Sequence, residues 1–553
     1  MPPLSAASGT PAFVRQSIDV TAFPWTRPLI GSYFRNFPAL APFFAGNPFD
    51  PAAWPEAIAR VRRAPRDRAA LGAVVEAQLT RRGAPAEAIA GARALADPDS
   101  VAVVTGQQAG LFGGPLYSLL KAITAIQIAR RVSAEQRALV VPVFWVEAED
   151  HDWAEVRTAH ILDKDFTLRD ITLPDLPGAG VQPIASLVLD DRIGDAIREL
   201  EAALPPSEFT AETIAALSRR YRPGAGVGEA FAGWMDDLLG RHGLVVFESA
   251  DRAAKPMVAD LFRDTLRQPG GVVEIAREAG ESLRALGHTP QVDAADGMTP
   301  LFYLDGQGRR AIRQQDGRLV AGTSTFTAAD LEREAAAHPD RFSPNVLLRP
   351  VVQDRIFPTI AYVAGPNELS YLAQVRGIYR ALGVEAPLVC PRGSATILDA
   401  ASAKFLERSQ LSLDALQTPD EAQLNALLER LLPPEIDQGL DRLQRDAAAS
   451  LEAIKATVAA VDPTLAGAVD TTRDRLQDTI KTLHSKIVAA AKRKDETLRR
   501  QYHRTQSLAF PGGHLQERVL NLAFFANRFG MTLGDRLLEA LPERPDRHYV
   551  LVL

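Results

Sequence analysis

Short continuous apolar runs alternate with helically spaced apolar positions up to about residue 400 of the chain. The runs SVAVVTG at 100–106 and ALVVPVFWV at 138–146 are typical of buried strands. Between them, PLYSLLKAITAIQIARRV at 115–132 has helical spacing and places Pro115 in the first turn. A strand, a helix and a second strand in this order form a βαβ unit, which favours a parallel sheet covered on both faces.

Further elements follow the same pattern. HGLVVFES at 242–249 predicts another buried strand, and TIAYVAGPNELSYLAQVRGIYRALGVEAPLVCPR at 359–392 repeats the order strand, turn, helix, strand. Helical periodicity from about 66 to 96 predicts helical structure there, and Pro98 marks its end. The segment 13–60 is rich in proline and aromatic residues, so we expect loops and short helices packed on a core.

Beyond about residue 400 the apolar positions take the alternating spacings of four and three residues that define a heptad repeat. The break VDPTLAG at 461–467 separates two such stretches and supplies the proline and glycine of a turn. We therefore expect an antiparallel coiled-coil hairpin, with two helices packed on a globular body as the alternative. The heptad positions are Ile436, Leu440, Leu443, Ala447, Leu451, Ile454, Val458, Leu476, Ile480, Leu483 and Ile487.

Composition narrows the class of protein. The 553 residues suffice for roughly three to four domain-sized units, and 46 % hydrophobic with 24 % charged residues is ordinary for a globular protein. A net charge of −6 gives no basic field for nucleic acid or a membrane surface. No apolar run reaches the roughly 18 residues of a membrane span, and no signal-peptide pattern is visible. The single cysteine, Cys390, excludes an internal disulfide, so we expect a soluble cytoplasmic protein.

The first candidate site is VTGQQAGLFGGP at 104–115, a glycine-rich turn between the first strand and its helix. Such a turn aims backbone N–H groups and the positive helix end at a phosphate or carboxylate. It lacks the GxGxxG spacing of a dinucleotide site and the ending of a P-loop. The paired amides of Gln107 and Gln108 could instead recognise a polar small molecule. The remaining alternative is that the glycines serve only tight packing.

The second candidate site is EAEDHDW at 147–153, directly after the second strand. Ligands of open α/β sheets bind beyond the carboxyl ends of the strands. Acids and a histidine at this place could bind an ammonium group, hold Mg²⁺ or act in acid–base catalysis. Zinc is disfavoured because no HxxxH and no cysteine pair accompanies them. The structural alternative is a helix N-terminus enriched in acids, which complements the helix dipole.

The third candidate site is LRPVVQDRIFPTIAYVAGPNELSY at 348–371. It places Arg349, Gln353 and Asp354 before an apolar strand, and the strand ends in another turn that opens a helix, 365–368. This turn resembles the first one in its pattern and would lie at the same edge of the sheet. An ordinary helix cap explains it equally well.

Two further features have ordinary explanations. The basic run KRKDETLRRQYHR at 492–504 could bind nucleic acid, but a solvated helix face is the more common meaning of such a run. Cys390 stands before Pro391 at the end of an apolar run, so we expect a buried structural thiol and not a nucleophile.

Four segments of the chain together resemble one known family. They are VTGQQAGLFGGPLYSLLKAITAI, VPVFWVEAEDHDWAEV, LRPVVQDRIFPTIAYVAGPNELSYLAQ and PGGHLQERVLN, in this order. The family that they resemble is the cysteine ligase of bacillithiol biosynthesis, BshC, and the resemblance covers nearly the whole chain. It implies an α/β fold whose Rossmann-type parallel-sheet core is similar to class I aminoacyl-tRNA synthetases. It also implies two connecting-peptide insertions and an α-helical antiparallel coiled coil that pairs subunits into a homodimer.

Combined with the apolar pattern, the resemblance predicts seven consecutive segments. These are the N-terminal segment and first part of the core at 1–155, connecting-peptide insertion 1 at 156–240, a core strand and helix at 241–265, connecting-peptide insertion 2 at 266–345, the second part of the core at 346–398, the coiled-coil domain at 399–508, and a C-terminal return to the core at 509–553.

The reaction that the resemblance implies joins L-cysteine to glucosaminyl malate and gives bacillithiol. In the core pocket, Glu149 and Asp150 would hold ammonium groups, His151 would act as the base, and the N–H groups of 106–110 would hold an anion. A nucleotide-holding site near the coiled coil is carried over to Arg392, Ser394 and His514. The substrate-binding residues carried over are Thr105, Gly106, Gln107, Gln108, Gly110, Asn367 and Glu368.

One departure from class I synthetases concerns the energy source. The HIGH and KMSKS signatures are absent from the sequence, so adenylation has no motif to support it. A carboxylate and an amine do not condense far in water without activation, which makes ATP or ADP with Mg²⁺ an open cofactor. No metal ligand set, nucleic-acid partner or membrane partner is expected. The alternatives are an adenylating ligase or nucleotidyltransferase for another amino acid, and a non-catalytic RNA-binding protein that resembles a synthetase.

Overall fold

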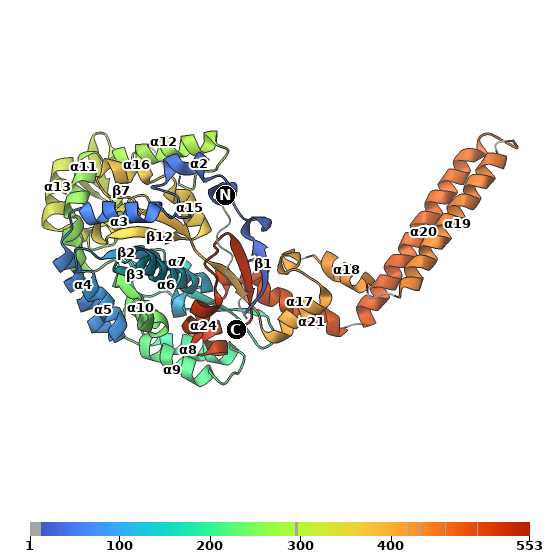
Figure 1. The fold of residues 1–553 in the computed structure, drawn as a ribbon, viewed down its shortest axis with the longest axis horizontal. Helices are drawn as coiled ribbons and strands as arrows, with labels where there is room; N and C mark the ends of the chain where they lie inside the picture. Colours follow the sequence, from blue (N-terminus) through green and yellow to red (C-terminus); the bar gives the residue numbers. More distant parts are fainter. Residues whose placement is uncertain (1–12, 293–296, 419, 431–432, 459, 495) are drawn as a thin grey trace. The chain divides into compact units, whose positions relative to one another are not determined.

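A computed structural model describes residues 13–292, 297–418, 420–430, 433–458, 460–494 and 496–553 (Figure 1). The chain divides into two compact units. The first contains Met1–Ile397 with His514–Leu553, and the second contains Leu398–Gly513. Among the helices of the described ranges, none combines the length and apolar character that crossing a membrane requires.

The first unit is built around a five-stranded sheet with the strand order β13-β12-β2-β3-β6. Every neighbouring pair in this sheet is parallel, as the βαβ pattern predicted. The predicted buried strands are confirmed, and their continuous apolar runs reflect burial on both faces. The strands are β2 (Val101–Gln108), β3 (Val140–Glu147), β6 (Val245–Glu248), β12 (Thr359–Ala364) and β13 (Leu388–Pro391).

Helices cover both faces of this sheet (Figure 1). Alternate residues of β2 point to opposite sides, so Val101 and Val103 pack in one apolar cluster with α3 and α6. Ala102 and Val104 pack in the other cluster, with α4 and α5. The helix predicted at 115–132 is confirmed as α6. The four helices are α3 (Ala53–Arg63), α4 (Arg68–Arg82), α5 (Ala86–Ala94) and α6 (Leu116–Gln136).

The helical periodicity predicted from about 66 to 96 is confirmed, and the structure divides this stretch into two helices, α4 and α5. Gly83 ends α4 with φ 68°, a left-handed conformation that glycine adopts without strain. Pro85 then precedes α5, where a fixed φ suits a helix start. Apolar spacing continues across this short turn, which concealed it in the sequence pattern.

The N-terminal segment 13–60 contains the short helices that were predicted, and also a strand that was not. Strand β1 pairs antiparallel with β15, and β15 pairs in parallel with β14. The two ends of the described chain thus meet in one small sheet of the first unit. The prediction missed β1 because its partner lies at the other end of the sequence. The elements are β1 (Val14–Asp19), α1 (Pro28–Arg35), α2 (Phe37–Leu40), β14 (Ser394–Ile397) and β15 (Arg547–Leu551).

Two stretches between core strands form smaller sheets of their own. The hairpin of β4 and β5 follows β3, and an antiparallel sheet with the order β10-β9-β8-β7-β11 precedes β12. The strands are β4 (Thr158–Leu162), β5 (Leu168–Thr172), β7 (Met298–Leu304), β8 (Arg309–Gln315), β9 (Arg318–Ala321), β10 (Ser324–Phe326) and β11 (Phe342–Pro344). The accompanying helices are α7 (Trp153–Val156), α8 (Arg192–Ala203), α9 (Thr210–Arg220), α10 (Val227–Leu239), α11 (Ala259–Arg267), α12 (Gly271–Ala285) and α13 (Ala328–Ala337).

The remaining helices of the first unit lie around β12 and at the C-terminal end of the chain. They are α14 (Arg349–Ile356), α15 (Pro366–Leu372), α16 (Arg376–Ala381), α22 (Gln516–Val519), α23 (Leu522–Phe529) and α24 (Leu533–Ala540). On β13, Cys390 is buried as predicted, and burial raises the pKa of its thiol to about 12. The thiol is therefore protonated and inert at neutral pH.

The second unit is helical, and its long helices α19 and α20 pack against each other as the predicted antiparallel hairpin. Lys455 of α19 bridges to Asp470 of α20 at 2.8 Å. Of the basic run at 492–504, the side chains of 492–495 lie outside the described residues. The helices are α17 (Ala400–Ser409), α18 (Ala422–Arg430), α19 (Pro434–Val458), α20 (Leu465–Lys494) and α21 (Glu496–Ala509).

Candidate active site at the strand ends

The carboxyl ends of β2, β3 and β12 lie at one edge of the parallel sheet. From β2 the chain continues through α6 to β3 on one side, whereas β12 and β13 lie on the other side of β2. The direction of strand addition therefore reverses between β2 and β12. Crevices at such reversal points are where open α/β sheets bind their ligands.

A cavity of about 510 Å³ lies at this edge, and we call it the strand-end cavity. Its wall combines the ends of the three strands with the turn that opens α15 and with the first residue of α14. Side chains of both charge signs line it, which suits a ligand that carries both anionic and cationic groups. The polar side chains of the wall are Gln107, Gln108, Tyr117, Lys121, Glu147, Glu155, Gln291, Arg349, Tyr362, Asn367, Glu368, Tyr371, Arg392 and Arg518.

A buried ion pair between Lys121 and Glu368 joins α6 to α15 across this wall. Lys121 also donates to the carbonyl oxygen of Gly106 at 2.5 Å, and burial lowers its pKa against the attraction of Glu368. Glu368 accepts from the amide of Gly365 at 2.7 Å and from the hydroxyl of Tyr362 at 2.8 Å. Burial alone would raise the pKa of Glu368, but Lys121 and the Gly365 amide outweigh it and lower the pKa. Glu368 is therefore ionised and its charge is balanced within the wall.

Arg349, at the start of α14, carries the charge of the opposite wall. Its guanidinium donates to the Tyr371 hydroxyl at 2.9 Å and to Gln353 Oε1 at 3.2 Å, and its Nε lies 4.0 Å from Glu147 Oε2. Burial would lower the pKa of Arg349, but Tyr371, Tyr362 and Glu147 raise it above its ordinary value. The fixed and fully charged guanidinium keeps further N–H groups for a carboxylate or phosphate.

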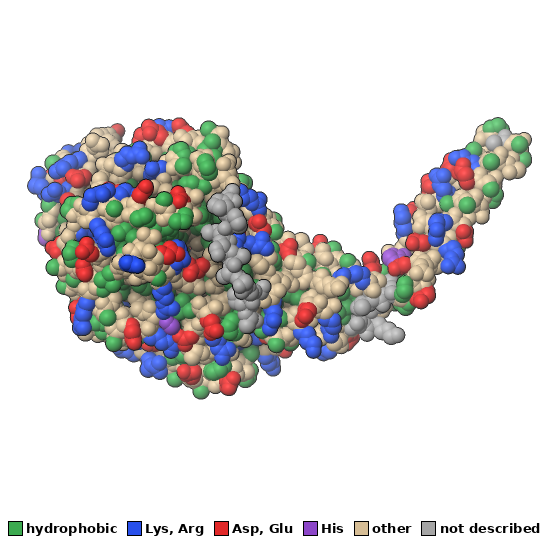
Figure 2. All heavy atoms as spheres, viewed as in Figure 1, with side chains coloured by type: hydrophobic (Ala, Val, Ile, Leu, Met, Phe, Trp, Pro, Cys, Tyr) green, Lys and Arg blue, Asp and Glu red, His purple; other side chains and the backbone are tan. Residues whose placement is uncertain are grey.

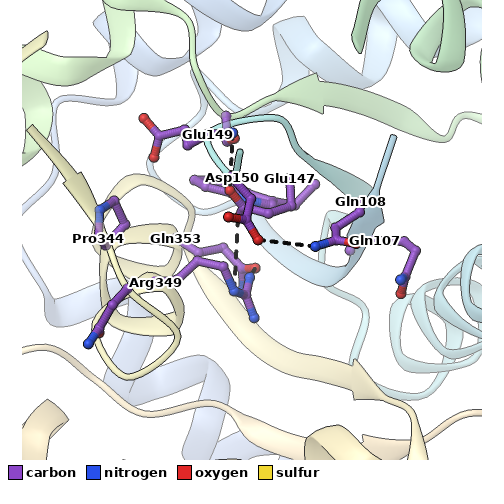
Figure 3. A network of polar contacts seen from close by, with 12 residues as sticks. Gln107, Gln108, Glu147, Glu149, Asp150, Pro344, Arg349 and Gln353 are labelled. Atoms are coloured by element: carbon purple, nitrogen blue, oxygen red, sulfur yellow. Dashed lines mark hydrogen bonds and ion pairs between the residues drawn. The ribbon is translucent and has the colours of Figure 1, made fainter. Parts of the chain in front are cut away.

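The two adjacent glutamines at the end of β2 face different partners. Gln107 Nε2 donates to the Tyr117 hydroxyl at 3.1 Å, and Gln108 Nε2 donates to Asp150 Oδ2 at 3.1 Å (Figure 3). Gln108 Oε1 is buried and has no hydrogen-bond partner within the described residues. A buried acceptor of this kind costs free energy unless water or a ligand donates to it. Both side chains line the strand-end cavity, and recognition of a polar small molecule by the two amides stays a prediction.

Glu149 of the acidic segment does not line the cavity. It is buried and forms an ion pair with Lys255, whose Nζ also donates to the carbonyl oxygen of Phe342 at 3.1 Å. Burial raises the pKa of Glu149, and Lys255 acts in the opposite direction. The carboxylate thus already holds an ammonium group of the chain itself.

Asp150 and His151 lie beside Arg309, outside the lining of the strand-end cavity. Arg309 Nη1 donates to Asp150 Oδ1 at 3.1 Å and lies 3.2 Å from His151 Nδ1. Asp150 reaches the cavity only through Gln108 (Figure 3). The carboxylate of Asp152 accepts from the amide of the third residue of α7 at 3.2 Å, so this acid is the helix cap of the structural alternative.

The glycine-rich turn after β2 is folded for close packing. The amide of Gly110 donates to the carbonyl oxygen of Gln108 at 2.9 Å, and that of Gly113 donates to the carbonyl oxygen of Gly110 at 3.1 Å. Gly113 has φ 96°, and a Cβ there would lie 2.7 Å from the Trp234 ring. Gly110 therefore has no free N–H group for the predicted anion contact, and close packing explains the glycines of this turn better than an anion cradle does.

A second cavity of about 310 Å³ adjoins the first, and we call it the aromatic cavity. The rings of Phe23 and Trp25 stack there, with centroids 5.2 Å apart and planes 15° apart. Three arginines line it against one acid, Glu517. Its lining includes the side chains of Phe23, Trp25, Arg27, Phe34, Arg392, Ser394, His514, Glu517 and Arg518.

Glu517 organises the polar wall of the aromatic cavity. It accepts from Arg392 Nη2 at 2.6 Å, from Ser394 Oγ at 3.1 Å and from the amide of Ala395 at 3.0 Å. Burial would raise the pKa of Glu517, but Arg392 and these hydrogen bonds lower it. His548 lies 2.7 Å from Ser394 Oγ, and burial lowers its pKa to about 4, so the ring is neutral at pH 7.

The structure gathers most of the predicted site residues around the two adjoining cavities. Thr105 is an exception, since it is buried and its Oγ1 donates to the carbonyl oxygen of Val363 at 2.9 Å. The residues on the strand-end cavity alone are Gly106, Gln107, Gln108 and Glu368, those on the aromatic cavity alone are Ser394 and His514, and those on both are Asn367 and Arg392. The residues on neither are Thr105, Gly110, Glu149, Asp150 and His151.

Sequence reasoning missed several residues of the wall. Lys121 carried a usable signal, because a lysine within the apolar stretch of α6 has to find a partner. Arg349 was named in the third candidate site, but the sequence assigned it no binding or catalytic role. Arg518 lies in PGGHLQERVLN, one of the four segments that carry the family resemblance, but no role was assigned to it. Trp25 and Arg27 gave no signal, since nothing in the local pattern of the N-terminal segment separates them from solvated side chains.

Within the described ranges, no group of three or more His, Cys, Asp or Glu side chains is placed to bind a metal ion. Of the acids of 147–153, considered for Mg²⁺, Glu147 lines the strand-end cavity. The other three take part in an ion pair, a contact with Arg309 and a helix cap.

Fold and site together define a Rossmann-like protein with a charged crevice at the reversal point of a parallel sheet and a separate helical coiled-coil unit. The chain belongs to the BshC family. The model "Bacillithiol biosynthesis BshC, N-terminal Rossmann-like domain" matches residues 16–393, and "Bacillithiol biosynthesis BshC, C-terminal coiled-coil domain" matches residues 395–553. The resemblance seen in the four sequence segments and the predicted fold class are thereby confirmed.

Curated relatives agree with this assignment over almost the full length. A protein of Salinibacter ruber named "Putative cysteine ligase BshC" is 36 % identical over 536 residues, which cover 96 % of each chain. Proteins of the same name from Koribacter versatilis and Heliobacterium modesticaldum are 30 % and 34 % identical. The former match covers 97 % of this chain and 99 % of the relative, and the latter covers 83 % and 84 %.

Proposed function

We propose that the protein is a cysteine ligase that joins the carboxyl group of L-cysteine to the amine of glucosaminyl malate in the last step of bacillithiol biosynthesis. The observation that carries the proposal is the charged strand-end cavity of about 510 Å³ in a chain whose full-length relatives are named cysteine ligases.

The charges of the strand-end cavity suit these two substrates. Glucosaminyl malate carries carboxylates, for which the guanidinium groups of Arg349 and Arg518 are suited donors. The ammonium groups of the substrates suit Glu147 and Glu155 on the same wall. Lys121 and Glu368 neutralise each other, so their role is to fix the wall, while the cavity's remaining charges meet the ligand.

Amide formation needs an activating co-substrate, and we place a nucleoside triphosphate such as ATP in the aromatic cavity. The stacked Phe23 and Trp25 offer a flat apolar surface to a base, and Trp25 is 39 % exposed. The arginines of this cavity suit phosphates. Mg²⁺ commonly binds through substrate phosphates with only one or two carboxylates, which is compatible with the absence of a larger ligand set in the described residues.

The decisive experiment mixes the purified protein with glucosaminyl malate and L-cysteine, with and without ATP and Mg²⁺, and follows the conjugate by mass spectrometry. We expect product only with ATP. Arg349→Met should lower kcat/KM by about 100-fold or more, because a charge-assisted contact to a substrate carboxylate is lost. Absence of product from folded protein with ATP, or full activity of Arg349→Met, would contradict the proposal. A preference for another amino acid would favour the alternative ligase.

The predicted base, His151, is tested in the same assay. It is partly exposed and reaches the cavity through Asp150 and Gln108. His151→Asn should abolish turnover if the histidine takes the amine proton, and unchanged turnover would remove it from the mechanism.

We also propose that two copies of the chain pair through the coiled coil in the cytoplasm. Apolar heptad positions of α19 and α20 remain exposed in a single chain, which supports a second copy as the partner. They are Leu443, Ile454, Leu476 and Leu483.

A further inference from the structure

The strand-end cavity and the aromatic cavity meet at one wall, and we infer that group transfer takes place there, with Arg518 contacting both bound ligands. The inference rests on the proposed function, because it assigns the acid and the amine to one cavity and the nucleotide to the other. The shared wall consists of Gly365, Pro366, Asn367, Arg392 and Arg518.

The two arginines of the shared wall differ in what they already bind. Arg392 is buried, and its Nη2 donates to Glu517 at 2.6 Å while its Nη1 donates to the carbonyl oxygen of Gly393 at 2.8 Å. Its charge is therefore neutralised and its position fixed. Arg518 on α22 is exposed, and its guanidinium makes no hydrogen bond or ion pair with any described part of the chain. The uncompensated cation of the wall is Arg518.

Chemistry requires the two ligands to touch. Reacting atoms must approach to about 3–3.5 Å. An acid in one cavity and a nucleotide in the other can therefore react only where their reacting ends meet, beside the residues that line both cavities. Gly365 and Asn367 of this wall belong to the turn between β12 and α15, held in place by Glu368 through its bond to the Gly365 amide. The turn at the end of β12 thereby fixes where the two ligands meet.

The transfer proceeds in two steps. In the first step, a carboxylate oxygen of cysteine attacks the terminal phosphorus of the nucleoside triphosphate and a new O–P bond forms. The bond from this phosphorus to the bridging oxygen breaks, and the nucleoside diphosphate leaves with the electron pair. The amine nitrogen of the sugar then attacks the acyl carbon, the C–N bond forms, the C–O bond to phosphate breaks, and the amine proton passes to the base, for which His151 is the candidate. Negative charge on the transferring phosphoryl oxygens is what Arg518 stabilises from the shared wall.

The test compares Arg518→Ala and Arg518→Lys with the wild type. The control variant is Arg63→Ala, since Arg63 is an exposed arginine of α3 that lines neither cavity. Calorimetry measures the binding of ADP and of glucosaminyl malate separately and together, and mass spectrometry measures turnover. For Arg518→Ala we expect each separate affinity to fall by no more than about tenfold and kcat to fall by about 100-fold or more. Arg518→Lys should restore part of kcat, which a merely structural role would not predict.

The effect of one bound ligand on the affinity for the other tests the role of Arg518 independently of the proposed reaction. In the wild type and in Arg63→Ala, glucosaminyl malate should change the affinity for ADP several-fold, and in Arg518→Ala the two ligands should bind independently. If the two ligands change each other's affinity but no product forms, the proposed reaction is overturned while the inference that both ligands meet at the shared wall stands. Wild-type kcat in Arg518→Ala, complete loss of one ligand alone, or independent binding in the wild type would overturn the role of Arg518. Failure of ADP to bind at all would overturn it as well.

Discussion

Single buried charges in this protein are compensated pair by pair. Lys121 with Glu368, Lys255 with Glu149, and Arg392 with Glu517 each bring together residues that are far apart in sequence. Removing one member leaves an uncompensated buried charge, which typically costs about 3–5 kcal/mol. These pairs fix the cavity walls because each partner comes from a different element.

Asp354 is the buried acid that lacks such a partner. It accepts from the hydroxyl of Tyr379 and from Gln353 Nε2 at 2.9 Å, and it forms no ion pair within the described part of the chain. Burial raises its pKa to about 6, and the hydrogen bonds only partly oppose this. Through Gln353, the same acid also fixes the guanidinium of Arg349 on the strand-end cavity.

The raised pKa of Asp354 predicts a specific pH dependence of stability. Between the unfolded pKa of about 3.9 and the folded pKa, the folded state binds more protons, so stability falls as the pH rises through this window. The free energy of unfolding of the wild type minus that of Asp354→Asn should fall by about 2 kcal/mol from pH 4 to pH 7. Urea denaturation at several pH values measures this difference, and a flat difference would contradict the assigned pKa.

At the scale of elements, the unit of β2, its turn and α6 positions the site. β2 delivers the two glutamines to the cavity, the turn reverses the chain through Gly113, and α6 returns Lys121 beneath the strand end. Phe112, Gly113 and Gly114 have positive φ in this turn, and the turn can pack closely on Trp234 because the residue beside that ring, Gly113, has no side chain.

Gly113→Ala should disrupt this unit. The methyl group combines a strained φ of 96° with a clash against the Trp234 ring, so we expect a loss of about 2–4 kcal/mol in the free energy of unfolding. Gly194→Ala is the matched control, since its Cβ would meet only Arg198 Nη1 at 3.6 Å within α8, and it should be neutral or stabilising. Equal stability of the two variants in thermal unfolding would show that the turn is not constrained as described.

At the scale of the whole molecule, the two units bury their apolar residues to different extents. The first has a continuous core around the parallel sheet, whereas α19 in the second has no buried residue among those described. Apolar side chains are interspersed with charged ones along the visible face of the hairpin (Figure 2). Leu443 and Ile454 are each 50 % exposed and Leu483 is 45 % exposed, although all three occupy heptad positions.

This exposure predicts that the coiled coil holds two copies together. Leu443→Glu combined with Leu483→Glu should weaken dimerisation by at least about 100-fold, because each leucine contributes roughly 1.5–3 kcal/mol when buried. Gln438→Glu, at an exposed polar position of α19, is the control and should remain dimeric. Light scattering after size exclusion measures the mass, and circular dichroism checks that the helices persist. A dimeric double variant would exclude these leucines from the interface.

The candidate site was predictable only in part. The sequence pointed to Gln107, Gln108, Asn367 and Glu368 because they follow buried strands, and the carboxyl ends of parallel strands meet at one edge. It could not sort the acids after β3, since the partner of Glu149 is Lys255, a residue more than one hundred positions away. The wall residues of α14 and α22 likewise belong to the site only through the packing of distant elements.

By itself, the sequence determined the parallel strands, the helix α6 between β2 and β3, the helical hairpin and the family. Continuous apolar runs, helical spacing and heptads are local patterns, and each reflects the burial of one short segment. Only the tertiary structure decided that β1 pairs with β15, that the amides of the glycine turn are used internally, and that two cavities share a wall at Arg518. The physical reason is that pairing, charge compensation and cavity shape depend on contacts between residues distant in sequence, which no local pattern records.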